Sequence, residues 1–459
     1  MIDKISILGL WKERNYRIEF VDGSLIVVGE NGSGKTTMLR IIYNVLSRNW
    51  LQLFDEDFEE IELKAGEEGL SINPNDVQGL EDYCINILQE FQDSMPLNVT
   101  RDLLRYCGEI NTPEKVLEAC QANHFPEVYV SYIKRVIDSK TRKIPTKIQE
   151  ANEWIKRHND YPIIYLPTYR RSERYLQDKD YLDSRIKRHR GYDMLVSDIE
   201  VAKEGMKDID ETIKARISEI KNEYARSSSE LNAKCFKGIL TREYGCVKTP
   251  DKITNSNSIQ RDYYENPESI SMIFSSISGT EFYIDNTKQI EEQLLQLLAK
   301  DGNYDDYDKI VVYFYQMLIE RYEHMKEIEE PLEAFFYACN KYLTNKKIQY
   351  LPNEFKYEIV LEEQEKKGKR TIDLNHLSSG EKQLVSLFSY VYLANPDRCM
   401  VIIDEPELSL SVEWQQSILE DVIKSGRCGS LIAATQSPFV YNNSLRSIAK
   451  ALDTFLTVE

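Results

Sequence analysis

The first 28 residues alternate apolar and polar positions with the two-residue period of β-strands. Three segments show this pattern, KISILGL, RNYRIEF and GSLIVVG, and a glycine-rich stretch follows the third. Beyond the glycines, TTMLRIIYNVLSRNW places apolar residues every three or four positions, which predicts a helix. Residues 1–50 therefore predict the first part of an α/β domain.

In the middle of the chain the apolar residues are mainly spaced as in helices. Residues 51–160 are acidic at first and predict a mainly helical insertion, and 161–175 hold an apolar strand, YPIIYLP, followed by an arginine loop. Residues 176–355 are charged and rich in tyrosine, and they predict a mainly helical inserted lobe. Within this lobe Val196–Lys234 predicts one long helix or a short helical arm, because it lacks the regular heptads of a long coiled coil.

Strand-like sequence returns in 356–459. Two apolar runs, CMVIID at 399–404 and LIAAT at 431–435, are short and unbroken, which is typical of buried strands. The second run presents Gln436 at its tip, and the Ser437-Pro438 pair stops the strand. The expected fold class is α/β, in which both ends of the chain form one domain around a large, mainly helical inserted lobe.

The composition narrows the class of protein. A chain of 459 residues is long enough for two or three lobes, and its 42% of hydrophobic residues can form large cores. We expect no membrane segment, because no apolar run approaches roughly 20 residues and the charge-punctuated N-terminus is unlike a signal peptide. The eight cysteines include no C-x-x-C pair, so we expect reduced thiols and a cytoplasmic location.

The charge is unevenly distributed. A net charge of −18 argues against non-specific coating of nucleic acid. Leu51–Asp93 carries 13 acids and one lysine, whereas Lys134–Arg190 carries 16 Lys and Arg against 8 acids. The basic region is a candidate DNA contact, and a solvated helical surface explains it equally well.

The stretch GENGSGKTT, Gly29–Thr37, matches the pattern G-x-x-x-x-G-K-[ST] between an expected strand and an expected helix. Its glycines let backbone N–H groups curve around phosphate oxygens at a helix N-terminus. Lys35 is expected to reach the β- and γ-phosphates of ATP, and the Thr36 hydroxyl is expected to bind Mg²⁺. The predicted nucleotide-binding residues are Asn31, Gly32, Ser33, Gly34, Lys35, Thr36 and Thr37.

Two carboxylates end the apolar run CMVIID. Acids at the end of a buried strand are costly unless they meet cations. Asp404 suits the Mg²⁺ shell, partly through water, and Glu405 suits the role of general base toward an attacking water. These two residues are the expected metal ligand and one expected catalytic residue.

The stretch LSSGEKQ, Leu377–Gln383, opens an expected helix just before that strand. Hydroxyl and backbone donors at a helix start make a second anion-binding site. The residues predicted to contact nucleotide here are Ser378, Ser379, Gly380 and Glu381.

Together, the P-loop, the LSSGE stretch and the strand ending in Asp-Glu resemble the head of ABC-type ATPases. The resemblance implies that Ser379 of one subunit meets the γ-phosphate held by Lys35 of another, so that heads pair at least as dimers. Roughly 340 residues separate these two positions. That spacing resembles the SMC-like, RecF-like and OLD-like ATPases, whose heads are split by an insertion.

Three stretches, DEPELSLS, ATQSP and YLPTYRR, resemble PtuA, the ATPase family of the Septu anti-phage defence systems and of their retron-associated relatives. That resemblance implies a partner nuclease of the HNH type, PtuB. The five histidines are isolated and only 23 residues follow Gln436, so we expect neither an HNH nor a Toprim nuclease within the chain. The implied role is an ATPase whose nucleotide state gates assembly and a partner nuclease.

Gln436 departs from the family pattern. In ABC-type heads this strand ends in a histidine that contacts the γ-phosphate and the attacking water. Glutamine can donate to phosphate and orient water, but it cannot carry a proton as imidazole can. We therefore predict slow hydrolysis, with Gln436 as the second catalytic residue, while glutamine in a working ATPase stays an alternative. Leu410-Ser411 likewise replaces the usual Leu-Asp pair.

Arg170, Arg171 and Arg174 lie in the loop after YLP, where they suit phosphate or an ion pair with the acidic stretch. Two alternative functions remain. One is a DNA repair or chromosome-structure ATPase that acts on DNA through the basic region, and the other is an ATP-binding scaffold without hydrolysis.

Overall fold

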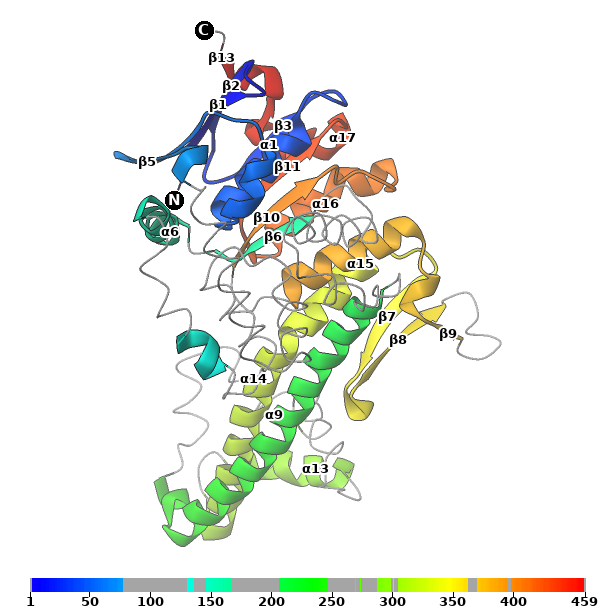
Figure 1. Cartoon of the computed structure of the whole chain (residues 1–459). Helices are drawn as coiled ribbons and strands as arrows, with labels where there is room; N and C mark the ends of the chain where they lie inside the picture. The colour runs from blue at the N-terminus through cyan, green and yellow to red at the C-terminus, as the bar shows by residue number, and fades with distance from the viewer. Residues whose placement is uncertain are drawn as a thin grey trace. The chain divides into compact units, whose positions relative to one another are not determined.

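The computed structural model shows two compact units (Figure 1). Met1–Glu204 and Asp397–Glu459 form the first unit, and Gly205–Pro396 forms the second. The lobe boundaries expected from the sequence stay predictions. The residues that the structure describes are 2–76, 130–135, 146–159, 161–166, 206–246, 269, 273, 287–298, 300, 304–361, 370–393 and 398–457.

A parallel sheet lies at the centre of the first unit. Its strands, in spatial order, are β12 (Ala449–Ala451), β3 (Leu25–Val28), β11 (Cys428–Thr435), β10 (Cys399–Asp404) and β6 (Ile163–Leu166). Every neighbouring pair in this sheet is parallel. All six residues of β10 are buried, as expected for a short apolar run inside a parallel sheet. The strands expected at YPIIYLP, CMVIID and LIAAT are thus confirmed.

An antiparallel sheet forms the other layer of this unit. Its strands, in spatial order, are β13 (Leu456–Thr457), β2 (Arg14–Glu19), β1 (Lys4–Leu10), β4 (Glu60–Ala65) and β5 (Glu68–Ile72). The expectation of mainly helical sequence after residue 51 is wrong for β4 and β5. In EIELKA the side chains of Ile61 and Leu63 are buried while Glu60 and Glu62 are more accessible, so the stretch has the two-residue period of a strand.

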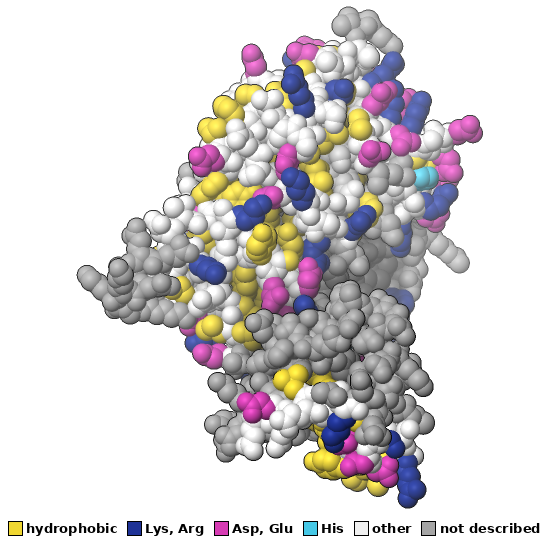
Figure 2. All heavy atoms as spheres, turned by 180° about the vertical axis from the view of Figure 1, so that it is seen from behind, with side chains coloured by type: hydrophobic (Ala, Val, Ile, Leu, Met, Phe, Trp, Pro, Cys, Tyr) yellow, Lys and Arg dark blue, Asp and Glu magenta, His cyan; other side chains and the backbone are white. Residues whose placement is uncertain are grey.

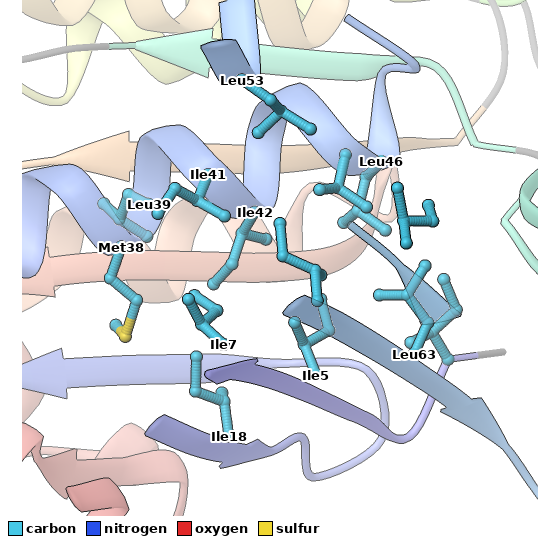
Figure 3. Close-up of a cluster of buried hydrophobic side chains, with 14 of the residues drawn as sticks. Ile5, Ile7, Ile18, Met38, Leu39, Ile41, Ile42, Leu46, Leu53 and Leu63 are labelled. Carbon is cyan, nitrogen blue, oxygen red and sulfur yellow. The ribbon is translucent and has the colours of Figure 1, made fainter. Parts of the chain in front are cut away.

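One hydrophobic core joins the two sheets to helix α1 (Lys35–Leu46). Figure 3 shows Met38 and Ile42 of this helix pointing toward Ile7 and Ile18 of the antiparallel sheet. Ile402 of β10 and Ile432 of β11 belong to the same core. Because α1 is fixed by this packing, the loop at its N-terminus has a fixed place at the edge of the parallel sheet.

Other helices also belong to the first unit. They include α6 (Thr146–His158), α16 (Val412–Lys424) and the short α17 (Pro438–Tyr441). Ser411 is the N-cap of α16, where its side chain accepts a hydrogen bond from the Trp414 N–H. A serine serves this cap as well as the aspartate that the family pattern places there, because both side chains offer a short oxygen acceptor.

Two long helices dominate the second unit. They are α9 (Lys207–Leu240) and α14 (Asp306–Asn340), which pack along each other, with the shorter α13 (Thr287–Leu298) beside them (Figure 1). The long helix expected between residues 196 and 234 is confirmed over its described part. Asp305 starts α14 with a capping box, and Pro331 lies inside that helix.

A small antiparallel sheet and one helix follow α14. The sheet consists of β7 (Lys346–Leu351), β8 (Lys356–Leu361) and β9 (Thr371–Ile372), and the helix is α15 (Ser379–Tyr392). The first and second units together confirm the expected class, an α/β fold with a largely helical insertion.

Lys and Arg side chains alternate with Asp and Glu side chains over the described surface of the face drawn in Figure 2. Within the described residues, no helix combines the length and the apolar character needed to cross a membrane.

Candidate functional site

Three neighbouring strands of the parallel sheet end at the same edge. The spatial order β3, β11, β10 places the P-loop after β3, Gln436 after β11, and Asp404 and Glu405 at the end of β10. Because carboxyl ends of parallel strands share one edge, residues that are far apart in the sequence meet there. The sheet topology thus assembles three of the motifs that the sequence analysis identified.

The P-loop has the backbone that its glycines allow. Gly32 and Gly34 have φ values of 78° and 104°, which residues with a side chain rarely adopt. Gly34 is the N-cap of α1 and provides no side-chain acceptor, so the first N–H groups of the helix stay available for an anion. Asn31 is exposed, and Ser33 and Thr37 are half-buried beside it.

Lys35 is buried beneath this loop. Its Nζ donates hydrogen bonds to the carbonyl oxygens of Gly29 (2.8 Å) and Glu30 (3.0 Å). The same ammonium lies 3.6 Å from Glu405 Oε1. Since loop carbonyls are weaker partners than phosphate, the structure holds a cation ready to exchange partners.

Thr36 and Asp404 are joined directly, although 368 positions separate them in the sequence. The Thr36 hydroxyl donates a 2.8 Å hydrogen bond to Asp404 Oδ2. Asp404 is only 3% exposed. A hydroxyl and a carboxylate held together at the edge of the sheet provide the oxygen ligands that Mg²⁺ prefers.

Glu405 has a strained backbone and a perturbed carboxyl group. Its φ is 51°, in the left-handed region. Burial raises the pKa of Glu405 to about 7, the carboxylates of Glu407 and Asp404 add to that shift, and Lys35 opposes it. A carboxyl group with this pKa exchanges protons near neutral pH, which is the property of a general base.

Gln436 lies immediately after β11, and its side chain is exposed. The expectation that a buried strand presents this glutamine at its tip is therefore confirmed. Its role at a phosphate stays a prediction.

The LSSGE stretch belongs to the second unit. Ser378 is the N-cap of α15, and Ser379 begins the helix with an exposed side chain. Gly380 is buried in the first turn. Hydroxyl and backbone donors thus stand at an accessible helix start, as the sequence predicted.

Glu381 has a different environment from its neighbours. Its carboxylate is buried and accepts two 2.8 Å hydrogen bonds from Lys346 Nζ, and it also accepts the Ser378 N–H at 2.7 Å. Burial raises the pKa of Glu381, but the bonds from Lys346 and Ser378 outweigh burial and hold that pKa below its usual range. Glu381 therefore fixes the helix start from inside, and Lys346, which the sequence analysis missed, holds Glu381.

Two residues beside the P-loop were also missed, because nothing in the strand period of β1 and β2 marks their turn. Trp11 has a φ of 55° and is 38% exposed. A Cβ atom at Gly34 would lie 3.2 Å from its ring. The Arg14 guanidinium lies 5.6 Å from the centre of that ring, and its Nη1 donates to the Ser33 carbonyl at 3.2 Å.

Several sequence-based expectations fall outside the described residues. Arg170, Arg171 and Arg174 are among them, and so is most of the candidate DNA contact at Lys134–Arg190. Within the part of the chain that the structure describes, no group of three or more His, Cys, Asp and Glu side chains is arranged to hold a metal ion.

Comparison with known proteins gives one family. Residues 1–440 match the protein family described as AAA ATPase domain. No curated protein matches the chain.

Two of the solved structures similar to this chain are Smc head domains. The first, from Pyrococcus furiosus, has an extended coiled coil and is bound to the C-terminal domain of ScpA; it is 14% identical, with 96% of this chain and 91% of that chain covered at a TM-score of 0.34. The second, from Pyrococcus yayanosii, has a coiled coil and joint and is also 14% identical, with 96% and 93% covered at a TM-score of 0.31. TM-scores this low do not establish a shared fold.

The ion pair inside the LSSGE helix start gives a stability prediction. Lys346→Ala should lower the free energy of unfolding by about 2 kcal/mol at neutral pH, because it leaves the buried Glu381 carboxylate without its cation. The depressed pKa of Glu381 means that this loss should shrink as pH falls and the carboxyl group is protonated. Urea denaturation at neutral and acidic pH measures both effects. The adjacent exposed Lys347→Ala is the control, and equal effects of the two substitutions would contradict the assignment.

Proposed function

Because this chain belongs to the family of AAA ATPase domains, we propose that it binds ATP with Mg²⁺ at the edge of the parallel sheet and that nucleotide state controls the assembly of its heads. Membership of this family supports the first part of the proposal, which is that the chain is an ATPase that binds nucleotide. The observation that carries the site is the hydrogen bond from Thr36 to Asp404, since it joins the P-loop to the acidic strand end.

The residues present fit the proposed ligand. The uncapped start of α1 and the left-handed glycines suit phosphate, and the Ser33 hydroxyl is buried without a hydrogen-bond partner among the described residues. Thr36 and Asp404 would hold the metal, partly through water. Mg²⁺, when bound, supplies positive charge to the β- and γ-phosphate oxygens.

Each catalytic residue then has a stated task. Lys35 exchanges the carbonyls of Gly29 and Glu30 for phosphate oxygens. Glu405 accepts the proton of the attacking water, which requires its ionised form. Gln436 donates its amide N–H to the γ-phosphate and orients water, but it holds no titratable proton. This division of tasks favours firm binding with slow turnover.

Assembly follows from the second helix start. Ser379 and Gly380 present donors that would meet a γ-phosphate held by another subunit. ATP would then join two heads, and loss of the γ-phosphate would release them. Nucleotide would act as the bridging ligand of a dimer.

The biological role that we propose for this ATPase is that of a subunit in an anti-phage defence complex. What supports it is the resemblance of DEPELSLS and ATQSP to the PtuA family. In this role the nucleotide-dependent assembly gates a separate HNH-type nuclease subunit, which binds through the mainly helical second unit.

The first prediction from this proposed function concerns assembly. Lys35→Ala should abolish most ATP binding, because it removes a buried cation from the phosphates. Ser379→Arg should leave ATP affinity nearly unchanged and block pairing, since its side chain is exposed at the shared surface. Isothermal titration and light scattering with and without ATP separate the two effects. ATP-dependent pairing that persists in Ser379→Arg would show that the site is not shared.

The second prediction concerns turnover. The wild-type chain should release phosphate more slowly than the common enzyme range of roughly 1–10³ s⁻¹, and Glu405→Gln should abolish the release. Because the Glu405 pKa is about 7 and only the ionised form accepts a proton, kcat/KM should rise as pH increases through neutrality. Steady-state phosphate assays test both points. Brisk release that depends on Glu405 would show that glutamine suffices at position 436.

The third prediction assigns a place to the base of ATP. The exposed Trp11 ring beside Gly34 should stack on the base, so Trp11→Ala should weaken ATP binding by about 10-fold, while Trp11→Phe retains most of it. Affinity for inorganic tripolyphosphate, which has no base, should stay unchanged in both variants. Competition titrations measure these affinities, and a parallel loss of tripolyphosphate binding would point instead to damage of the P-loop.

A further inference from the structure

Glu407 is a buried carboxylate to which the proposed chemistry assigns no step of its own, although it adds to the raised pKa of Glu405. It lies three positions beyond Asp404 and is 9% exposed. Its Oε1 accepts the backbone N–H groups of Gln436 at 3.0 Å and of Ser437 at 3.1 Å. Two consecutive donors beyond the end of β11 thus converge on one oxygen of the acidic loop.

A second link joins the same segment to helix α16. The Ser437 hydroxyl donates a 2.8 Å hydrogen bond to Gln415 Oε1. The amide nitrogen of Gln415 donates in turn to the Leu410 carbonyl at 3.0 Å. Gln415 therefore connects the tip of β11 to the segment Leu408–Ser411, which leads into α16.

We propose that Glu407 is a positioning residue that fixes the backbone of Gln436 for contact with the γ-phosphate and, with Gln415, couples that contact to Leu408–Ser411. The inference rests on the proposed ATP site and adds a means of reading its γ-phosphate. Leu408 and Ser409 are exposed, so a neighbouring head can contact the segment that directly follows Glu407, the residue that holds the Gln436 backbone.

The chemistry of glutamine makes this anchoring necessary. An uncharged amide gains a hydrogen bond to phosphate only within about 3.2 Å and in good alignment, whereas a charged group acts over longer distances. The side chain of Gln436 is exposed. Glu407 accepts the backbone N–H of Gln436 and does not hold its side-chain amide. A shift of the backbone by about 1 Å would therefore lose the contact.

The ratio of ADP to ATP dissociation constants measures the γ-phosphate contact. In Glu407→Ala this ratio should fall by about 10-fold, the effect of losing one hydrogen bond to a charged group, with ADP affinity unchanged. Glu407→Gln keeps an acceptor oxygen at the same reach and should restore the ratio to within about two-fold. In a Gln436→Ala background, Glu407→Ala should change the ratio no further, because both act through one contact.

A second variant protects the test against misfolding. Glu407→Asp keeps the charge but withdraws the oxygen by one methylene, so it should lower the ratio as alanine does while the thermal unfolding midpoint stays close to that of the wild type. Gln415→Ala should leave the ratio largely intact and weaken ATP-dependent pairing. Titrations of the full chain with ATP and ADP, together with light scattering, measure all variants.

The outcomes separate this inference from the function on which it rests. Wild-type ratios in both Glu407→Ala and Glu407→Asp would overturn the positioning role alone, and so would losses that add fully to that of Gln436→Ala. Failure of the wild-type chain to bind ATP would overturn the proposed function and this role with it. Failure of Glu407→Gln to restore the ratio would show that the charge, rather than the acceptor geometry, is what matters.

Discussion

The hydrogen bond between Thr36 and Asp404 depends on one constraint, the parallel order of β3, β11 and β10. A parallel sheet places the carboxyl ends of its strands along one edge, and each strand here continues into a different functional loop. The core between α1 and the two sheets fixes that edge, because the helix cannot shift without opening tightly packed side chains such as Ile42 and Ile432. The site is therefore as rigid as the core on which it rests.

Among the described residues at this edge, Lys35 is the buried cation around which the carboxylates are arranged. Lys35 faces Glu405, while Asp404 and Glu407 lie in the same acidic turn. Burial is the main reason why the pKa of Glu405 rises despite its contact with Lys35, and the carboxylates of Glu407 and Asp404 add to that rise. The left-handed φ of Glu405 is consistent with a turn whose geometry serves the site rather than local stability.

The second unit contains an accessible helix N-terminus, that of α15, which buried contacts hold in place. Ser379 is exposed at the beginning of α15, and Ser378 caps the helix by accepting the Glu381 N–H. The buried contact between Glu381 and Lys346 stabilises the same turn. Lys346 is the first residue of β7, which follows helix α14 after a short connection. Helix α14 also packs directly against α15, so this ion pair adds to a direct contact between the long helix and the residues that are proposed to meet a neighbouring head.

The sequence by itself determined the local features of this protein. Local sequence patterns predict the P-loop, the strand ends and Gln436. These patterns are the strand period of KISILGL, the glycines before α1 and the acids at the end of the CMVIID strand. The strand at EIELKA does not follow from composition, because the acids of this segment indicate a charged surface, and only the alternation of Ile61 and Leu63 with polar residues marks the strand. The pairing of Glu407 with the backbone of Gln436, of Lys346 with Glu381 and of Trp11 with Gly34 was decided by tertiary structure alone. Each joins segments whose separation in the sequence carries no periodic signal, and only the folded sheets and helices bring their atoms within contact distance.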